Sequence, residues 1–408
     1  MKEVAKDKVK HADVDFSLER VPLTARKPFI AMFVIMLGFT FFSASMSVGA
    51  KMANGLDLTQ FLWAVLIGGA ILGAYTGVLA YISNETGMSL DLLTHRSFGT
   101  IGSFLPSALI SFTQIGWFGV GVAMFAYPAA ELLKIPVWVL VVIAGIAMTS
   151  SAYFGIKGLE IVSYVSVPLI TILGTYSMIT AVRDGGGIVS IFDKSTGGMT
   201  LFAAIGMVIG SFVSGGTATP NFTRFAKTKK SAVITTVIAF FLGNTLMFMF
   251  GAVGGAYTGQ EDIFYVMIAQ GLAIPALIVL GANIWTTNDN ALYTGGLGLS
   301  NITKIRKRPM VLVSGVIGTA TAIWLYNNFI GWLSFLNATL PPIGAIITID
   351  YFLNRGKYTE ENDDKLRKVN VFALLGVVAG ALVGNFVKWG ISAINAMVVA
   401  CIVYYLGT

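Results

Sequence analysis

Residues 38–45 read GFTFFSAS, and residues 210–217 read GSFVSGGT. Each stretch begins with glycine, continues with aromatic residues and then small residues, and has poor helix propensity inside an apolar run. Small residues also let intact membrane helices pack closely, which is the alternative explanation for either stretch alone. Their starts at 38 and 210 are 172 residues apart, about five spans. This pairing favours two interrupted helices, a pattern typical of a transport site at the membrane midplane.

The composition of the whole chain is that of a membrane protein. Of its 408 residues, 55% are hydrophobic and 12% are charged, and the mean hydropathy is +0.78. A soluble domain carries about 25% charged residues. Runs of the roughly 20 apolar residues that a spanning helix needs recur along the chain. We therefore predict an all-α integral membrane protein with about twelve transmembrane helices, at 28–50, 60–83, 101–130, 136–156, 161–182, 200–219, 231–257, 264–300, 309–326, 328–353, 369–387 and 389–406.

The placement of basic residues predicts the orientation. Residues 1–27 are polar and charged, lack the apolar core of a signal peptide, and are expected to form a cytosolic tail. This tail and the loops on its side hold 22 of the 27 Lys and Arg residues, and the other loops hold 5. By the positive-inside rule, both termini face the cytoplasm. Because these charges lie in short loops and not along one soluble face, nucleic acid is not an expected partner.

Residues 114–119, QIGWFG, place an amide and an indole on one helix face, because Gln114 and Trp117 are three positions apart. The amide offers hydrogen-bond donors and an acceptor, and the indole offers a flat apolar plate. Together they suit a flat heterocycle with a donor and acceptor edge. The alternative is a tryptophan in the interfacial belt and a glutamine bonded to another helix. Trp117 lies well inside its run, which weakens the belt explanation.

Residues 283–290, NIWTTNDN, concentrate polar groups at membrane depth. Asn283, Thr286 and Thr287 share one helix face. Two hydroxyl groups and a nearby carbonyl suit a small alkali cation, and an interrupted first helix could add the carbonyl groups of Gly38 and Phe41. The alternative is that each threonine hydroxyl bonds back to its own helix.

Two acidic residues lie within the apolar runs. Asp289 is either functional or a structural group bonded to a neighbouring helix. Asp350 lies near a cytoplasmic end and is expected to be an interfacial anchor. The single cysteine, Cys401, excludes an intramolecular disulfide and a cysteine metal cluster. No Walker loop, zinc-ligand pattern or nucleophile elbow stands out, so neither an ATP-driven pump nor an enzyme is expected.

A family resemblance rests on five stretches: LGFTFFSASM at 37–46, QIGWFGVGVAMFAY at 114–127, FFLGNTLMFM at 240–249, NIWTTNDNALY at 283–293 and WLYNNFIGWL at 324–333. In this order they resemble the nucleobase:cation symporter-1 family, over nearly the whole chain after the tail. The resemblance implies a LeuT-like fold similar to sodium-coupled amino-acid transporters. It has two inverted five-helix repeats, about 28–182 and 200–353, and two extra helices at about 369–406. In one departure, Asn221 follows Pro220 where the family commonly has aspartate, which puts a pairing with Arg224 in doubt.

The resemblance also implies the binding sites, between broken helices one and six and helices three and eight. The base would stack between Trp117 and Phe212. Its polar contacts would come from Gln114, Ser211, Ser214 and Asn283, with backbone groups near Phe42 and Ser43. The sodium ion would be held by the carbonyl groups of Gly38, Phe41 and Asn283 and by the hydroxyl groups of Thr286 and Thr287.

The expected function is the import of cytosine across the bacterial inner membrane, coupled to a cation, expected to be sodium, by alternating access. Besides this coupling ion no cofactor is expected, and besides the substrate and the bilayer no obligatory protein partner is expected. One alternative is a proton-coupled importer of another flat heterocycle, such as uracil, a purine, a hydantoin or a thiamine precursor. A channel or a membrane sensor is the alternative from a different class.

Overall fold

The computed structural model describes residues 15–193, 195–260, 262–363, 365–387 and 389–407, and it is helical throughout, apart from one isolated bridge between Lys27 and Ala226. In chain order, these helices are η1 (Leu23–Ala25), α2 (Phe29–Thr40), α3 (Ser43–Gly55), α4 (Leu58–Thr86), α5 (Leu90–Phe98), α6 (Phe104–Leu133), α7 (Val137–Ala152), α8 (Ile156–Asp184), α9 (Ile188–Phe192), α10 (Leu201–Thr217), α11 (Pro220–Thr223), α12 (Lys229–Val237), η2 (Ile238–Gly243), α13 (Asn244–Thr258), α14 (Ile263–Ala269), α15 (Ala273–Thr303), α16 (Lys307–Asn327), α17 (Phe329–Thr339), α18 (Pro341–Leu353), η3 (Arg355–Tyr358), η4 (Glu360–Asn362), α19 (Val371–Phe386) and α20 (Ser392–Leu406).

Each predicted span coincides with one helix or with a run of consecutive helices. Within the described ranges, six helices are long and apolar enough to cross a membrane by themselves, and the bent pair α2–α3 makes a seventh. Four more apolar helices have 10–17 residues, namely α7, α18, α19 and α20. The all-helical membrane fold is therefore confirmed, while the number of twelve spans stays a prediction.

The predicted interruption of the first span is present. Helices α2 and α3 are bent by 51° at a break of two residues. Phe41 and Phe42 both have extended backbone, with φ and ψ of −78° and 91° and of −134° and 132°. A helix that ends leaves its last carbonyl groups without partners in its own ladder. The break therefore makes backbone oxygens at the end of α2 available to other ligands.

The second predicted interruption was wrong. Helix α10 continues through residues 210–217 and ends at Thr217, where Ala218 and Thr219 lead into α11. Residues 208–217 are all buried, so they have no water to replace their helical hydrogen bonds, and the small side chains serve packing instead. Pro220 begins α11 as its first residue, a position that suits proline because its missing N–H would have no helical partner there.

One distortion has no counterpart in the predictions. The span 229–258 consists of α12, a π-helical segment η2 and α13. A π-helical insertion widens a helix by one residue and occurs often at functional sites. It shifts the direction of every side chain that follows it, beginning with Asn244.

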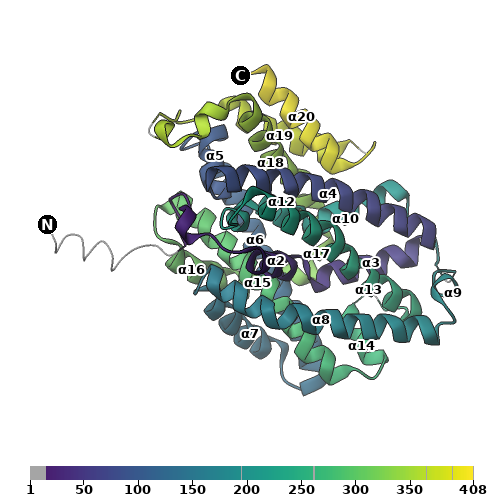
Figure 1. The fold of residues 1–408 in the computed structure, drawn as a ribbon. Coiled ribbons are helices and arrows are strands. Elements are labelled where there is room, and N and C mark those ends of the chain that lie inside the picture. The colour runs from purple at the N-terminus through teal and green to yellow at the C-terminus, as the bar shows by residue number, and fades with distance from the viewer. Residues whose placement is uncertain (1–14, 194, 261, 364, 388, 408) are drawn as a thin grey trace, which may run out of the picture.

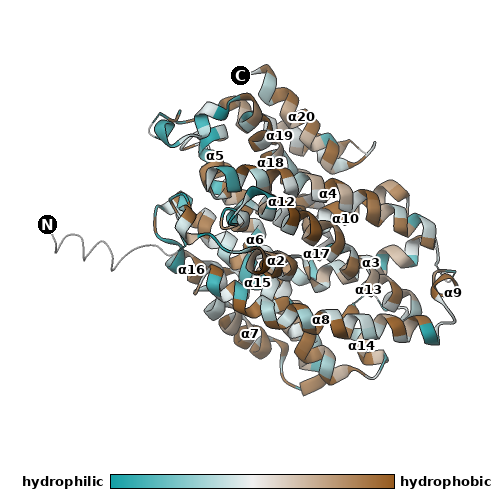
Figure 2. Cartoon of the chain, in the orientation of Figure 1, coloured by the Kyte–Doolittle hydropathy of each residue, from teal (hydrophilic) through white to brown (hydrophobic). Residues whose placement is uncertain are grey.

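The helices pack into one bundle (Figure 1) with α15 in contact with α6, α7, α8 and α16, and with α3 in contact with α13. Helices α19 and α20 form a pair at one edge of the bundle, and α7 lies at the opposite edge. The α3–α13 contact is close: a Cβ atom added to Gly251 would lie 1.7 Å from the carbonyl oxygen of Met46. Hydrophilic residues gather at the end that holds α5, the N-terminal segment and the loop after α18 (Figure 2).

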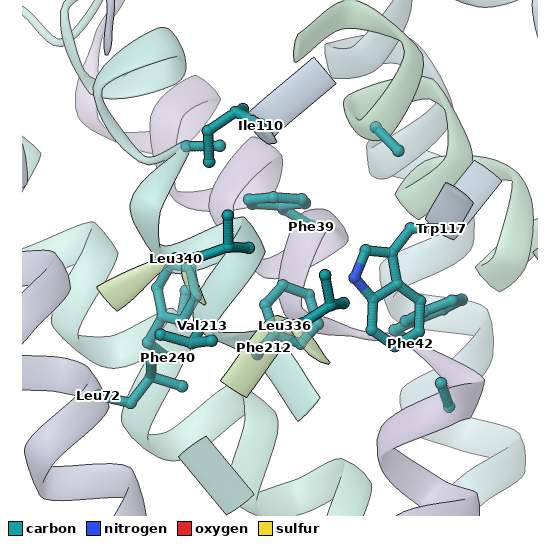
Figure 3. Close-up of a cluster of buried hydrophobic side chains, with 14 of the residues drawn as sticks. Phe39, Phe42, Leu72, Ile110, Trp117, Phe212, Val213, Phe240, Leu336 and Leu340 are labelled. Atoms are coloured by element: carbon teal, nitrogen blue, oxygen red, sulfur yellow. The ribbon is translucent and has the colours of Figure 1, made fainter. Parts of the chain in front are cut away.

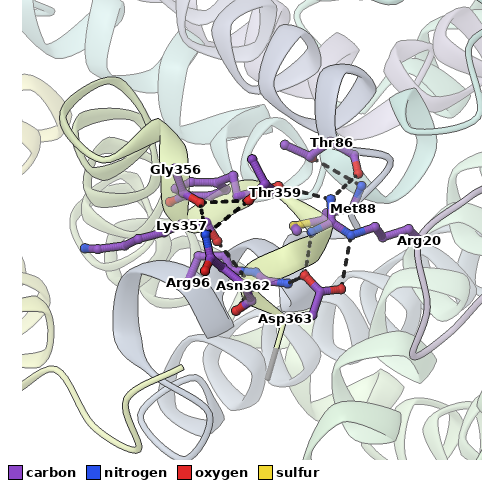
Figure 4. A network of polar contacts seen from close by, with 10 residues as sticks. Arg20, Thr86, Met88, Arg96, Gly356, Lys357, Thr359, Asn362 and Asp363 are labelled. Carbon is purple, nitrogen blue, oxygen red and sulfur yellow. Dashed lines mark hydrogen bonds and ion pairs between the residues drawn. The ribbon is translucent and has the colours of Figure 1, made fainter. Parts of the chain in front are cut away.

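Part of the predicted tail is packed against this hydrophilic end. Residues 1–14 lie outside the described residues, but Arg20 donates hydrogen bonds to the carbonyl oxygens of Thr86 (3.0 Å) and Tyr358 (3.1 Å). It also pairs with Asp363 at 2.7 Å, and Arg96 of α5 pairs with the same carboxylate (Figure 4). Burial alone would raise the pKa of Asp363, but these two guanidinium groups lower it. The network ties the N-terminal segment to α5 and to the loop after α18.

Candidate functional site

Asn283 of α15 connects the break in the first span to the eighth predicted span. Its Oδ1 atom accepts a hydrogen bond from Ser43 Oγ at 2.9 Å, and its Nδ2 atom donates to the carbonyl oxygen of Phe41 at 2.6 Å. Thr287 Oγ1 donates to the same carbonyl oxygen at 3.2 Å. All four residues are buried. Predicted substrate and cation ligands thus meet in one hydrogen-bonded cluster at the break.

The other two predicted cation ligands differ in how they join this cluster. Thr286 Oγ1 donates to the carbonyl oxygen of Asn283 at 2.7 Å. This bond lies within α15, as in the alternative that each threonine hydroxyl bonds back to its own helix. Gly38 lies in the last turn of α2 and packs against α8, where a Cβ atom added to it would lie 2.3 Å from Ser163 Oγ. Ser163 is fully buried and its hydroxyl has no hydrogen-bond partner among the described residues. Ser163 was not among the predicted site residues, because its apolar run also holds other hydroxyl residues, such as Ser166 and Thr171, and nothing in the sequence singles it out.

The predicted stacking residues occur in two neighbouring aromatic groups (Figure 3). Trp117 of α6 contacts Phe42 at the break edge-to-face, with ring centroids 5.6 Å apart. Phe212 of α10 contacts Phe39 at 5.3 Å and Phe240 at 5.6 Å. Phe39 lies in the last turn of α2, and Phe42 lies in the break itself. The break therefore connects the groups of Trp117 and Phe212.

The other residues predicted to contact the base are buried. Within the described ranges, no hydrogen bond joins them to the cluster around Asn283. Gln114, on the same face of α6 as Trp117, is 2% exposed, and its Nε2 atom has no partner among the described residues. Ser211 Oγ donates to the carbonyl oxygen of Val208 in its own helix at 2.9 Å. Ser214 is also buried on α10. Gln114 thus carries a buried donor that remains unsatisfied.

A cavity of about 1000 Å³ lies beside α6, where Phe112 lines it before Trp117 in the sequence. Val120 and Met124, three and seven residues after Trp117, line it together with residues of α3, α10, α16 and α17. Its lining also includes Lys51 and Asp262, from the loops predicted to be outside the cell. Burial raises the pKa of Asp262 to about 6, although its carboxylate accepts a hydrogen bond from the N–H of Phe264 at 2.8 Å.

Residues 20–407 match the family model described as "Permease for cytosine/purines, uracil, thiamine, allantoin". The chain belongs to this permease family. It is 46% identical over 395 residues to the cytosine permease of Escherichia coli strain K12, an alignment that covers 97% of this chain and 94% of that protein. This confirms the family resemblance stated from the sequence, and the permease is a transporter and not an enzyme.

Solved transporters share the permease's fold. The structure of Mhp1, a nucleobase-cation-symport-1 family transporter in a closed conformation with bromovinylhydantoin bound, superposes with a TM-score of 0.80. It has 19% identity and covers 95% of this chain and 93% of that chain. A Na⁺-coupled sialic acid symporter in a substrate-bound outward-open state gives a TM-score of 0.74 at 16% identity, covering 98% and 92%. At these identities the likeness shows the fold.

The two acidic residues predicted to lie within apolar runs of the permease differ in their surroundings. Asp289 accepts a hydrogen bond from Ser151 Oγ at 2.6 Å, and Ser151 Oγ in turn accepts one from Trp285 Nε1 at 2.6 Å. The Oδ2 atom of Asp289 has no partner within the described ranges. Asp350 is fully buried and holds the end of α18 to the following loop and to α20, through Asn354, Lys357, Tyr358 and Tyr404.

The asparagine that departs from the family pattern has a structural role of its own. Asn221 Oδ1 accepts a hydrogen bond from the N–H of Leu90 at 2.9 Å and so contacts the start of α5. Arg224 is fully buried and donates to the carbonyl oxygens of Asp15 at 2.9 Å and Phe16 at 2.8 Å. The N-terminal segment therefore satisfies Arg224 through its backbone, which the sequence alone did not indicate.

Proposed function

We propose that the permease imports cytosine by symport with a sodium ion, through alternating access. The observation that carries this proposal is the pair of hydrogen bonds made by Asn283, which join Phe41 and Ser43 at the break to α15. A cation and a base bound to this one cluster would each stabilise the arrangement that the other needs. By reciprocity, sodium would then raise the affinity for the base as much as the base raises the affinity for sodium.

In this proposal the base lies between the faces of Trp117 and Phe212, next to the part of α6 that lines the large cavity at Val120. Stacking of this kind contributes roughly 1–3 kcal/mol per base at nucleic-acid platforms. Polar contacts come from Gln114, Ser211, Ser214 and Asn283, with backbone groups near Phe42 and Ser43. The unsatisfied Nε2 atom of Gln114 supports this role, because an unpaired buried donor costs about 1–3 kcal/mol unless a ligand satisfies it.

Sodium would bind beside the base, at the carbonyl oxygens of Gly38, Phe41 and Asn283 and the hydroxyl oxygens of Thr286 and Thr287. This donor set contains oxygen only and no carboxylate, which suits an ion of single charge. The end of α2 at Thr40 supports it, because the last carbonyl groups of a helix need partners from outside the helix. No group of three or more His, Cys, Asp or Glu side chains able to hold a metal occurs in the described part of the chain.

The proposed orientation places both termini in the cytoplasm of a bacterial cell, in the inner membrane. With this orientation the large cavity opens outwards. At the other end, Asp15 and Phe16 cover Arg224. We propose that this arrangement is the outward-facing stage of the transport cycle, with the base and sodium entering from the cavity.

The test is uptake of labelled cytosine by proteoliposomes that contain the purified protein. Accumulation above the external concentration with an inward sodium gradient, and none without it, is the expected result. Trp117→Ala is expected to abolish saturable uptake at micromolar cytosine. Passive equilibration that never exceeds the external concentration would indicate a channel, and uptake at unchanged affinity by Trp117→Ala would refute the site.

A proton-coupled transporter of another flat heterocycle is the second candidate. The contacts of Asp289 favour it, since this buried carboxylate has one oxygen without a described partner. Uptake that persists without sodium, falls as the external pH is raised, and is lost in Asp289→Asn would establish proton coupling. A panel of competing bases would identify the substrate in either case.

A further inference from the structure

Asn244 is a buried polar residue that the proposed function has not used. It is 1% exposed, and neither its Nδ2 atom nor its Oδ1 atom has a hydrogen-bond partner in the part of the chain that the structure describes. Leaving one such buried group unpaired costs about 1–3 kcal/mol. A carboxamide with both ends unsatisfied is therefore a strong indication that something else binds there.

The backbone places Asn244 beside the break in the first span. It is the first residue of α13 after the π-helical segment η2. Its neighbour Gly243 faces the break directly, because an added Cβ atom would lie 2.9 Å from Thr40 Oγ1 and 3.3 Å from the ring of Phe41. Asn244 is thus at the level where Phe41 and Ser43 bond to Asn283.

The helix face of Asn244 is directed towards the aromatic groups of the proposed site. Phe240, one turn before it, contacts both Phe212 and Phe39. Phe248, one turn after it, lies against α3, where its carbonyl oxygen is 2.2 Å from a Cβ atom added to Gly49. Phe248 lies four positions after Asn244 within α13 and shares its helix face, which places Asn244 on the side of α3. Phe240 lies inside the π-helical segment η2, about one of its wider turns before Asn244, and its contacts mark α10 as the neighbouring helix there.

We propose that the Asn244 carboxamide binds the hydrogen-bonding edge of the transported base. A cation would use Oδ1 alone and would leave the Nδ2 donor unpaired, and an anion would leave Oδ1 unpaired. A planar heterocycle with a donor next to an acceptor satisfies both atoms at once, as asparagine does when it reads the edge of adenine. Cytosine has such edges. Asn244 would then be a residue for base selection, supplied by a helix that the sequence analysis assigned no role.

This inference rests on the proposed function, so its test begins with wild-type protein that binds cytosine in a Trp117-dependent way. Asn244→Leu keeps the approximate volume and removes both hydrogen-bonding atoms. At saturating sodium it is expected to weaken cytosine binding about tenfold or more, from the loss of two hydrogen bonds. The sodium concentration that gives half-saturation at saturating cytosine is expected to stay unchanged. Thr245→Val is the matched control, because the Thr245 hydroxyl donates only to Phe241 of its own helix.

Two further variants keep the test decisive. Asn244→Ser serves if Asn244→Leu folds poorly, as judged by thermal melting, and it is expected to show the same weakening. Asn244→Asp removes the donor and is expected to weaken cytosine binding without tightening sodium binding. Unchanged cytosine affinity in Asn244→Leu and Asn244→Ser would overturn the inference, and so would tighter sodium binding in Asn244→Asp, which would identify a cation ligand. Failure of the wild type to bind cytosine would refute the proposed function instead.

Discussion

Lys307 Nζ lies 2.6 Å from Asp15 Oδ2, in an ion pair whose side chains are 0% and 5% exposed. The other carboxylate oxygen of Asp15 accepts a hydrogen bond from the N–H of Ile156, at the start of α8, at 3.2 Å. The backbone carbonyl of Asp15 accepts from Arg224. One residue of the N-terminal segment therefore joins α8, α16 and the segment after α11 at the end of the bundle opposite the large cavity.

Asp15→Asn is expected to loosen this end of the bundle. A buried ammonium group that loses its carboxylate partner destabilises a protein by roughly 3–5 kcal/mol. We expect a lower melting temperature in detergent and faster labelling of a cysteine introduced at Asn221, measured in a Cys401→Ser background. Glu160→Gln is the control, because the Lys27–Glu160 pair at 2.5 Å is about one-fifth exposed. Such partly exposed pairs contribute about 0–1 kcal/mol, so equal effects of the two substitutions would contradict the assignment.

Gly38→Ala is expected to disturb the proposed sodium site by a steric route. The added Cβ atom would lie 2.3 Å from Ser163 Oγ and 2.8 Å from Ser163 Cβ, so α2 and α8 must separate. Overpacking of this kind costs about 1–3 kcal/mol. We expect weaker sodium-dependent cytosine binding, measured by titrating sodium at fixed cytosine.

Ser163→Gly provides the matched test of that mechanism. It removes both atoms that the new methyl group would meet, so the double variant Gly38→Ala/Ser163→Gly is expected to recover most of the lost sodium affinity. Equal defects in the single and double variants would show that the methyl group does not act through Ser163.

Thr287→Val is expected to weaken sodium coupling. Thr287 Oγ1 bonds across the break to Phe41 at 3.2 Å, whereas Thr286 Oγ1 bonds within α15. We expect the sodium concentration for half-maximal uptake to rise about tenfold in Thr287→Val, from the loss of one charged-group contact of about 1.5 kcal/mol. Thr321→Val is the control, since the Thr321 hydroxyl bonds only within α16. A normal sodium requirement in Thr287→Val would remove Thr287 from the proposed site.

The sequence predicts the parts of this fold that depend on local composition. Apolar length placed the six helices and the bent pair that are long and apolar enough to cross a membrane, because a bilayer fixes how many apolar residues a span needs. The break at Phe41 and Phe42 was also predictable, since glycine and bulky aromatic residues in succession favour extended backbone there. The matching composition of residues 210–217 misled. Both segments are buried, but only at the first break do side chains of another helix, Asn283 and Thr287, bond to a freed carbonyl group, that of Phe41.

What the sequence could not indicate depends on contacts between distant residues. Asp15 meets Ile156 across 141 positions and Lys307 across an even longer separation, and no local pattern marks these partners. Asn244 was hidden for the same reason: a single asparagine in an apolar run indicates neither the π-helical segment before it nor the helix that it faces. Asn283 was predictable because its neighbours Thr286 and Thr287 repeat at helical spacing, so that several polar residues together marked one face.

Acidification is expected to destabilise the permease between about pH 6.5 and pH 4, through His95 of α5. Burial lowers the pKa of His95 to about 4, with Lys304 and Arg96 adding repulsion, although its hydrogen bond to Asn301 Oδ1 at 2.7 Å opposes this. In the unfolded chain the histidine binds a proton at about pH 6.5. The stability that neutral, buried His95 contributes is therefore complete above that pH and is lost as the pH falls towards 4.

His95→Gln, which can still donate to Asn301 and does not titrate, is expected to flatten the fall in melting temperature between pH 7 and pH 5. Because Asp91 and Asn301 both contact Ser107 in the same network, Ser107→Ala is the control for a general loss of packing. Parallel melting curves for wild type and His95→Gln across this range would assign the acid sensitivity to other groups.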